Sequence, residues 1–191
     1  MARKLPRSFY GRSTLDVARD LLGKLLCVRY PEPATAGRIV EVEAYRNRDD
    51  LASHAYRGIT PRNEVMFGKP GMSYVYFIYG MYYCFNIVTE KNGTAGACLI
   101  RALEPIDGIS IMMERRRTSI ETRLTNGPGK LCTALGIGRT HNGVDLTGND
   151  LFLADDGYLP SRIGHSTRIG IRHATDKPWR FFIKDHPCLS R

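Results

Sequence analysis

Two glutamates on one short segment have the type and spacing that acid–base chemistry requires. Glu41 and Glu43 lie within residues 38–45, where apolar and polar side chains alternate. A strand with this alternation presents both carboxylates on one face and turns the intervening apolar residues towards the core. A carboxylate held in place can activate water as a general base. A solvated strand face is the commoner fate of such a pair, so both interpretations stay open.

Aromatic side chains follow the glutamates closely. Tyr45 shares the predicted face of Glu43, and His54 lies in the next segment. A dense set of tyrosines comes after them: Tyr74, Tyr76, Tyr79, Tyr82 and Tyr83. Tyrosine favours strands, so sheet packing accounts for part of this set. Phenol rings also stack on flat groups and attract cations, and a purine alkylated on a ring nitrogen is both flat and cationic.

Tyr79 and Asn86 hold special positions in a predicted hairpin. Two strand-like runs, residues 74–79 and 82–88, are joined around Gly80. A tyrosine at such a tip is exposed and can act as a wedge between stacked bases. Asn86 falls in the second run, in the expected core. A buried asparagine needs hydrogen-bond partners, so it either braces the backbone or contacts the edge of a ligand.

The charge of the chain favours a polyanionic partner. Its 191 residues carry a formal net charge of +9, and its pI is about 9.5. Such an excess of Lys and Arg favours binding to nucleic acid. Residues 127–130 lack the spacing and the Ser/Thr of a P-loop, which excludes nucleotide hydrolysis, but a helix that starts at Lys130 can hold a DNA phosphate. The candidate phosphate ligands are Arg62, Lys130, Arg168 and Arg172.

The cysteines and the first residues bear on the compartment. Five cysteines are scattered without a C-x-x-C pair, which argues against disulfides and against a zinc site and fits a reducing cytoplasm. The first residues lack the apolar stretch of a signal peptide, and no segment has the apolar length of a membrane span. The sequence therefore predicts a cytoplasmic protein, associated with the nucleoid if it is bacterial, without a membrane anchor or a bound metal.

The order of the predicted elements indicates an α+β fold. We expect one compact domain over residues 1–191, built around a curved, mainly antiparallel sheet with a protruding hairpin and peripheral helices. Residues 1–12 are expected to be loose or laid along a surface. Helices are predicted to start after Ser13, at Pro105 and at Lys130. Strands are predicted over residues 24–29, 38–45, 74–79, 82–88 and 99–103, with a long loop over 46–73.

Several blocks of the sequence together resemble the alkyladenine (3-methyladenine) DNA glycosylase family. They follow the family's order and cover most of the chain: residues 38–45, 60–63, 69–71, 74–82, 86–87, 101–105 and 127–131. Long blocks that match together are far more specific than one short motif. The resemblance implies a DNA-repair enzyme that works without a metal ion, a cofactor or a lysine Schiff base.

The resemblance also implies which residues catalyse the reaction. Glu43 corresponds to the carboxylate that acts as general base for water. Arg101 corresponds to an arginine near the pocket that helps to hold the water and the nucleotide backbone. These two residues are the predicted catalytic groups.

The remaining correspondences concern the contact with DNA. Tyr45 and Tyr76 correspond to the aromatic walls on either side of a flipped base, and His54 to the residue that closes the pocket. Tyr79 corresponds to the tyrosine that intercalates to fill the gap in the duplex. Asn86 corresponds to the residue that crowds the 2-amino group of normal guanine.

The predicted function is that of a monofunctional DNA glycosylase in base excision repair. It is expected to flip alkylated or deaminated purines, such as 3-methyladenine, 7-methylguanine and hypoxanthine, out of double-stranded DNA. Water activated by Glu43 then hydrolyses the N-glycosidic bond, and a monomer suffices for one lesion. The alternatives are a non-catalytic protein that binds damaged DNA and a hydrolase or transferase for a small substrate. The first gives Glu43 no task, and the second needs neither an exposed Tyr79 nor a strong positive charge.

Overall fold

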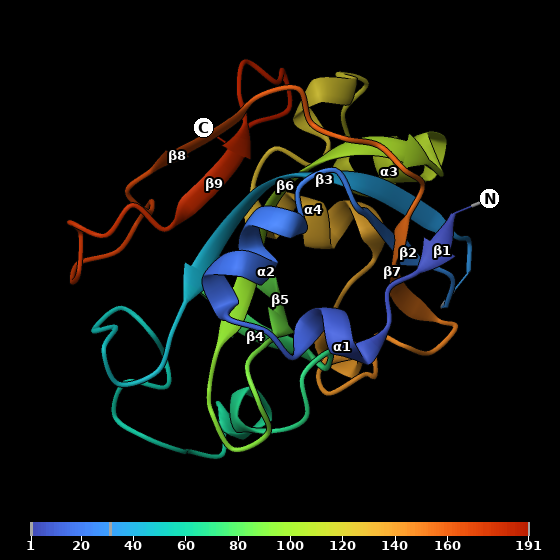
Figure 1. Cartoon of the computed structure of the whole chain (residues 1–191). Helices are drawn as coiled ribbons and strands as arrows, with labels where there is room; N and C mark the ends of the chain where they lie inside the picture. The colour runs from blue at the N-terminus through green and yellow to red at the C-terminus, as the bar shows by residue number, and fades with distance from the viewer. Residues whose placement is uncertain (1, 31, 191) are drawn as a thin grey trace.

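A curved antiparallel sheet forms the centre of the computed structural model, which describes residues 2–30 and 32–190 (Figure 1). Its strands follow the order β1-β7-β2-β3-β6-β5-β4, and β9 joins β8 to β3. The strands are β1 (Arg3–Lys4), β2 (Leu25–Val28), β3 (Thr35–Tyr45), β4 (Ser73–Ile78), β5 (Tyr82–Val88), β6 (Ala97–Asp107), β7 (Leu151–Asp155), β8 (Ile163–Ser166) and β9 (Arg180–Ile183). The helices are α1 (Arg7–Tyr10), α2 (Thr14–Asp20), α3 (Ile109–Arg116) and α4 (Pro128–Leu135). The predicted α+β fold around a mainly antiparallel sheet is confirmed.

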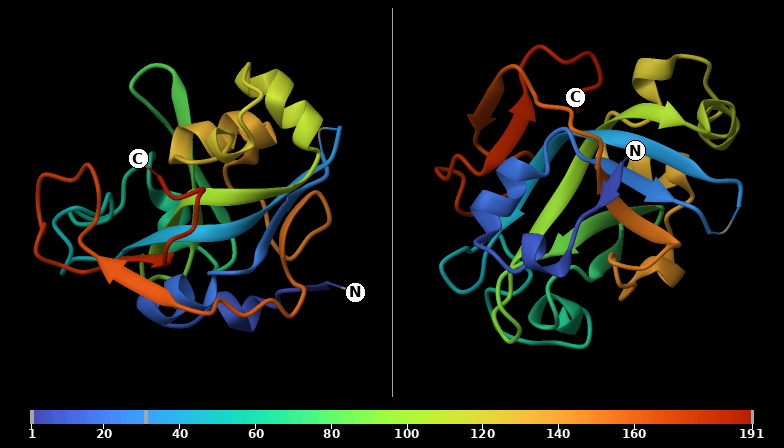
Figure 2. Two further views of the ribbon diagram at one scale, coloured as in Figure 1. Left: turned by 90° about the horizontal axis from the view of Figure 1, so that it is seen from above. Right: turned by 45° about the vertical axis from the view of Figure 1, so that its right-hand side comes forward.

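Helices cover both faces of the sheet. The view from above in Figure 2 shows α1 and α2 on one side and α3 and α4 on the other. On the first side α2 contacts β3 and β6, and on the second α4 contacts β5 and β6. Because both sides are covered, Glu41, Val42 and Glu43 are all buried with 0% exposure. The interpretation of the glutamates as a solvated strand face is therefore wrong.

β3 bends at a bulge beside the first glutamate. Between the pairs Ile39–Leu103 and Glu41–Ala102 of β3 and β6, Val40 is an extra residue. A bulge increases the twist of a strand and re-aims its side chains. Beyond the bulge β3 pairs with β9, whereas before it β3 pairs with β2. The two glutamates therefore lie where the sheet changes partners, between β6 and β9.

The first residues are ordered, so of the two alternatives for residues 1–12 the loose segment is wrong. β1 pairs with β7 in the sheet, and α1 follows directly. Leu5 is 6% exposed and Tyr10 is 0% exposed, so both belong to the core. Burial of these two apolar side chains offsets the entropy of ordering a basic segment. Met1 lies outside the described residues.

The other predicted elements are confirmed with one exception. The hairpin of β4 and β5 forms as predicted, with Ile78 paired to Tyr82. Helix α2 begins after Ser13, and α4 begins two residues before the predicted Lys130. The prediction that Pro105 opens a helix is wrong, because Pro105 lies inside β6, opposite a register shift in β3. A proline is tolerated at such an irregularity because its missing N–H breaks no regular ladder bond.

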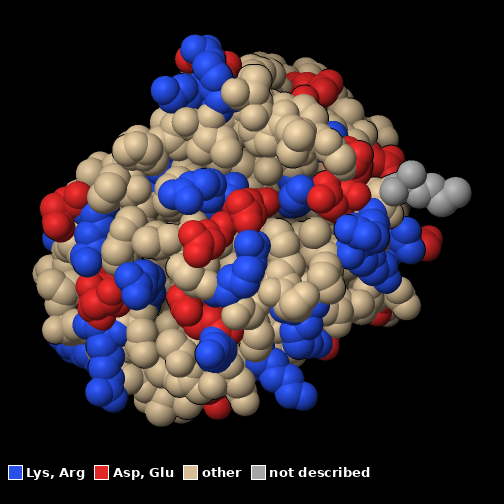
Figure 3. All heavy atoms as spheres, in the orientation of Figure 1, with Lys and Arg blue, Asp and Glu red and all other residues tan. Residues whose placement is uncertain are grey.

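The charges on the face that α1 and α2 cover are mixed. Figure 3 shows Lys and Arg side chains interspersed with Asp and Glu on this face. Several of them are paired, for example Arg12 with Asp20 and Lys24 with Asp155. The positive net charge therefore does not mark this face as a binding surface. Among the described residues, no helix is long and apolar enough to cross a membrane.

Candidate active site

A pocket of about 610 Å³ opens beside the hairpin. The end of β3, the loop after it, the hairpin β4–β5, the start of α4 and residues 169–173 form its walls. Pockets for small molecules typically span about 300–1,000 Å³, so this one has room for a purine base. Eight of the predicted site residues line it: Tyr45, His54, Tyr76, Tyr79, Asn86, Arg101, Lys130 and Arg172.

Glu43 lies directly behind the pocket wall. Its Oε2 accepts a hydrogen bond from the Tyr45 hydroxyl at 2.8 Å, and its Oε1 accepts one from the Ile169 N–H at 2.7 Å. Arg101 Nη1 lies 3.3 Å from Oε1. The two hydrogen-bond donors and the arginine of the ion pair all belong to residues that line the pocket. A carboxylate has about four acceptor positions, so these bonds fix the group and leave capacity for a water.

Glu41 has a different environment, although it is two residues away. Its Oε1 accepts hydrogen bonds from Arg101 Nε at 3.1 Å, Arg180 Nε at 2.7 Å and Ser190 Oγ at 2.7 Å. Its Oε2 accepts one from the Ser190 N–H at 2.7 Å. These four donors occupy the acceptor capacity of a carboxylate. Glu41 is therefore suited to hold Arg101 in place, and Glu43 is the carboxylate suited to act on water.

Arg101 connects the two carboxylates. Its side chain is 10% exposed, and it contacts Glu41 through Nε and Glu43 through Nη1. Because a guanidinium is always charged, this arginine keeps a positive charge at the floor of the pocket. The same charge stabilises both buried carboxylates, which are costly to bury without a partner.

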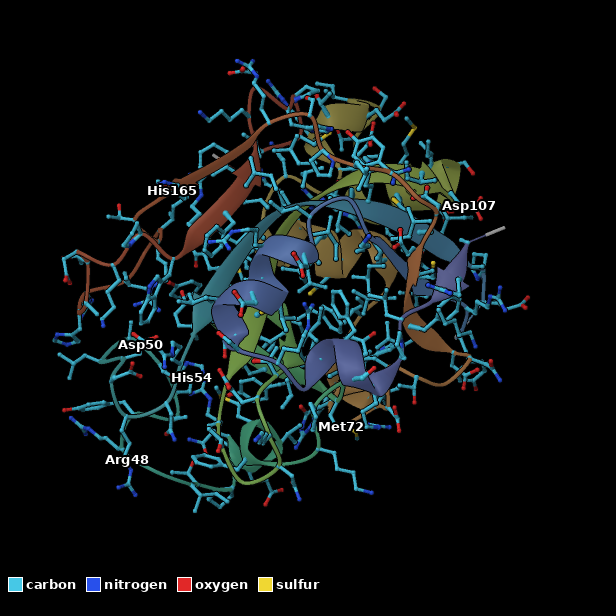
Figure 4. The ribbon with its side chains drawn as sticks, in the orientation of Figure 1. Arg48, Asp50, His54, Met72, Asp107 and His165 are labelled. Carbon is cyan, nitrogen blue, oxygen red and sulfur yellow. The ribbon has the colours of Figure 1, made fainter. Side chains whose placement is uncertain are left out.

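His54 and two tyrosines form an aromatic wall opposite. His54 Nδ1 lies 2.9 Å from the Tyr74 hydroxyl, and the rings of His54 and Tyr76 are 4.7 Å apart between centroids. In Figure 4, His54 lies on the loop that follows β3, near the end of the strand. Burial and the nearby charge of Arg62 lower the pKa of His54, so the imidazole is neutral at neutral pH. Burial raises the pKa of Tyr74 to about 12, which keeps its phenol protonated.

Asn86 occupies the floor near this wall and is 4% exposed. Its Nδ2 donates a hydrogen bond to the Tyr74 carbonyl at 3.1 Å. The asparagine therefore braces the hairpin backbone and lines the pocket at once. The two alternatives that the sequence left open for Asn86 are compatible.

Tyr79 is at the tip of the hairpin, as predicted, and is 80% exposed. Met81 N donates to the Ile78 carbonyl at 3.3 Å, and Tyr79 and Gly80 have φ of +54° and +67°. Two consecutive residues with positive φ are typical of a type I′ turn, which normally uses Asn or Gly. A tyrosine in this region carries backbone strain, and strained residues cluster at functional sites. Phe77 and Met81 beside it are 50% and 64% exposed, so the tip is apolar.

The four predicted phosphate ligands differ in position. Lys130 and Arg172 line the pocket, and Arg62 lies 5.5 Å from the centroid of the Tyr76 ring. Arg168, in contrast, is 5% exposed, and both of its terminal nitrogens bind Asp50 at 2.6 and 2.7 Å. Burial does not fit the phosphate contact expected of Arg168, and its position indicates a structural role instead.

Four residues of this site were missed by the sequence reasoning: Asp50, Ile169, Arg180 and Ser190. They contact the glutamates or Arg168 across 118 to 149 positions of the chain. Local patterns carry no signal for contacts at such separations. Among the described residues, no group of three His, Cys, Asp or Glu is placed to hold a metal ion.

An aromatic pocket with a buried carboxylate behind it and an exposed aromatic tip beside it suits an enzyme that acts on a single extruded base. The family model described as methylpurine-DNA glycosylase (MPG) matches residues 8–187. The chain therefore belongs to the methylpurine-DNA glycosylase family, which places it among the DNA glycosylases of base excision repair.

Similar proteins occur in bacteria and archaea. One from Alkaliphilus oremlandii is 50% identical, over 98% of this chain and 99% of its own length. One from Methanocella arvoryzae is 49% identical, over 98% of this chain and 96% of its own length. One from Chlorobium luteolum is 49% identical, over 98% of this chain and 97% of its own length. Each of the three is named "Putative 3-methyladenine DNA glycosylase".

Proposed function

We propose that this protein is a monofunctional glycosylase that removes alkylated and deaminated purines from double-stranded DNA. Its substrates would include 3-methyladenine, the base in the names of its relatives, together with 7-methylguanine and hypoxanthine. The observation that carries the proposal is Glu43, a buried carboxylate held by two hydrogen bonds and one ion pair from residues that all line an aromatic pocket. We infer that a monomer acts, because one chain supplies every wall of the pocket.

The proposed reaction uses Glu43 as general base. A purine stacks between Tyr45 and the wall of Tyr76 and His54, so that C1′ of its sugar lies near the pocket floor. The C1′–N9 bond breaks, its electron pair leaves with the purine, and positive charge builds on the sugar. Water then bonds to C1′ and gives its proton to Glu43. The anionic carboxylate stabilises the developing charge, an effect that is strong in a site from which water is excluded.

Cationic and neutral lesions make different demands on this site. A 3-methyladenine or 7-methylguanine base already carries a positive charge, so it departs as a neutral molecule and attracts the π-faces of the walls. Hypoxanthine is neutral, so it leaves as an anion that takes up a proton from the solvent, and its excision depends more on stacking and on accurate placement over Glu43. The protein is proposed to excise the charged lesions faster.

Tyr79 is proposed to fill the gap that the flipped nucleotide leaves. Extruding a base costs a few kcal/mol, and least for damaged bases. An exposed phenol ring on a strained turn is available for stacking without any rearrangement of the core. The neighbouring apolar side chains of Phe77 and Met81 would enter the same widened base step.

Basic groups at the pocket mouth are proposed to hold the DNA backbone. Lys130 lies at the start of α4, where residues 126–130 line the pocket and the N-terminal end of the helix favours a phosphate. Arg172 lies on the facing segment and Arg62 beside the aromatic wall. Binding that rests on such contacts weakens steeply as salt rises.

Single-turnover cleavage of a lesion-containing duplex tests the proposal. Duplexes with one 7-methylguanine or one hypoxanthine are incubated with excess protein, and an undamaged duplex of the same sequence serves as control. We expect alkali-labile abasic sites from both lesion-containing duplexes and none from the undamaged duplex. We also expect no adduct with the protein after borohydride reduction. Lesion-specific binding without abasic product would instead establish a non-catalytic damage-binding protein. A borohydride-trapped adduct would contradict hydrolysis by water.

A further inference from the structure

The buried ion pair of Arg168 and Asp50 lies behind the pocket. It takes no part in the proposed reaction, but it connects three walls of the pocket. Arg168 and Asp50 both have 0% side-chain exposure, and they form a bidentate pair at 2.6 and 2.7 Å. Arg168 Nη1 also donates to the Ala44 carbonyl at 2.9 Å, at the end of β3. Among the described residues its Nε–H has no partner, a cost that a pair serving stability alone would not need.

The position of this pair in the chain links it to the pocket. Leu51 and Ala52, which directly follow Asp50, line one side of the pocket. Ile169, which directly follows Arg168, lines another side and donates its N–H to Glu43. Figure 4 shows Arg48, Asp50 and His54 together on the loop that follows β3. The pair therefore fastens two loops to each other at the points where both enter the pocket.

The guanidinium of Arg168 also covers a face of the proposed base-stacking wall. It lies 4.6 Å from the centroid of the Tyr45 ring and 5.2 Å from that of Trp179. Tyr45 lines the pocket as well, so this ring has the cation of Arg168 on one side and the pocket on another. A cation on one face of a ring draws π-density towards itself and weakens the attraction for a second cation.

We propose that Asp50 and Arg168 are a positioning pair that fixes Tyr45 and the flanking loops, and that sets how strongly the pocket favours cationic over neutral bases. The inference rests on the proposed function, because it concerns the bases that the pocket accepts. With the pair in place, the Tyr45 ring is held in position for stacking on any flat base, and its cation–π attraction for a charged base is weakened. Without the two charges, neutral bases stack less well on Tyr45, and the cation–π attraction for cationic bases becomes stronger.

The test compares two neutralised pairs. The variant Asp50→Asn with Arg168→Gln keeps hydrogen-bonding groups but removes both buried charges. The matched control is Arg162→Gln with Asp185→Asn, a pair of the same residue types at 2.6 Å whose side chains are 68% and 78% exposed. We expect the ratio of 7-methylguanine to hypoxanthine excision rates to rise about tenfold in the buried variant, through loss of one cation–π competitor. The control variant should leave the ratio unchanged.

Equal loss of both excision rates in the buried variant would overturn the proposal, because a merely structural pair would act on both lesions alike. Arg168→Lys provides a second test, since it keeps the positive charge but loses the bidentate contact of the guanidinium with Asp50. The ratio of 7-methylguanine to hypoxanthine excision rates in this variant should stay close to that of the wild type. If the buried double variant does not fold, Arg168→Lys is the remaining test. A tenfold difference between its ratio of excision rates and the wild-type ratio would overturn the role of the charge.

A readout that needs no activity separates this inference from the proposed function. Trp179 is the single tryptophan of the chain and contacts Arg168. We expect acrylamide quenching of its fluorescence to increase in the buried variant and not in the exposed control. Unchanged quenching would overturn the positioning role. If wild-type protein cleaves neither lesion, the proposed function fails, and the Trp179 measurement still decides whether the pair fixes this region.

Discussion

The carboxylates behind the pocket wall and the tip of the hairpin differ in almost every physical respect. Glu41 and Glu43 have 0% exposure and are surrounded by arginines, whereas Tyr79 is 80% exposed at the end of a two-stranded projection. Removing one partner of a buried ion pair costs about 3–5 kcal/mol. Removing an exposed side chain usually changes stability by less than about 0.5 kcal/mol.

The difference shows how this small domain divides its tasks. The region behind the pocket wall holds charges in fixed positions, at a desolvation cost that the rest of the core must offset. The tip holds an apolar ring in water on a strained turn, so that the ring is available to a partner. Substitutions of the carboxylates behind the wall should therefore alter the excision rate or the stability of the fold. Substitutions at the tip should alter the affinity for DNA alone.

The largest effect is expected from Glu43→Gln. The amide cannot take a proton from water, so single-turnover excision should fall by about 10³-fold, within the range of general-base catalysis. Lesion affinity should stay within about twofold, because the aromatic walls and the basic mouth are unchanged. A binding titration beside the excision assay separates the two quantities, and wild-type excision by this variant would remove Glu43 from the mechanism.

Glu41→Gln should mainly lower stability. The amide would face two arginines with a donor in place of an acceptor, so the free energy of unfolding should fall by about 3 kcal/mol. At a temperature where the variant is folded, excision should fall by less than about tenfold, since Glu43 keeps its own donors. Urea denaturation measures the first quantity. A stable but inactive Glu41→Gln would reverse the assignment of the two carboxylates.

Tyr79→Ala should weaken lesion binding by about tenfold, the order of one base–aromatic stack, without lowering the melting temperature. Tyr79→Phe should bind like wild type because it keeps the ring. Tyr30→Ala is the matched control, since Tyr30 is 67% exposed on another part of the molecule. Fluorescence anisotropy with a hypoxanthine duplex checks this prediction, and equal affinity for Tyr79→Ala and wild type would exclude the wedge.

The smallest effect concerns pH. The pKa of His54 lies below its ordinary value of 6.5 in the folded protein, because of burial and the charge of Arg62. As pH falls below 6.5 the unfolded chain takes up this proton first, so the stability present above pH 6.5 is progressively lost. His54→Gln should flatten this decline, as measured by urea denaturation at pH 7 and pH 5. An equally steep decline in the variant would show that other groups cause it, such as His186, whose pKa is also lowered by burial.

The sequence predicted the parts of the fold that depend on local patterns. Alternation predicted β3 and the hairpin, and Gly80 predicted the exposed position of Tyr79. The alternation of β3 did not predict that both of its faces are buried, because that depends on α2 and on β9. The prediction of a helix start at Pro105 is wrong because local signals do not reveal a register shift between distant strands.

The residues that meet at the pocket were predictable from the sequence, and their arrangement was less so. Glu43, Tyr45, His54 and Asn86 carry their types and spacing in the sequence, and the structure brings them together around one pocket or directly behind it. The roles of Glu41 and Arg168 were not predictable, because their partners lie more than 100 positions away. A basic residue is most often exposed, and nothing in the neighbourhood of Arg168 indicates its buried partner Asp50.

The most direct test of this account compares Glu43→Gln and Glu41→Gln in one single-turnover assay with a 7-methylguanine duplex, at a temperature where both variants are folded. The account predicts abasic product at background level from Glu43→Gln and at more than about a tenth of the wild-type rate from Glu41→Gln. Equal rates from the two variants, or a faster Glu43→Gln, would contradict the assignment of Glu43 as the base that activates water.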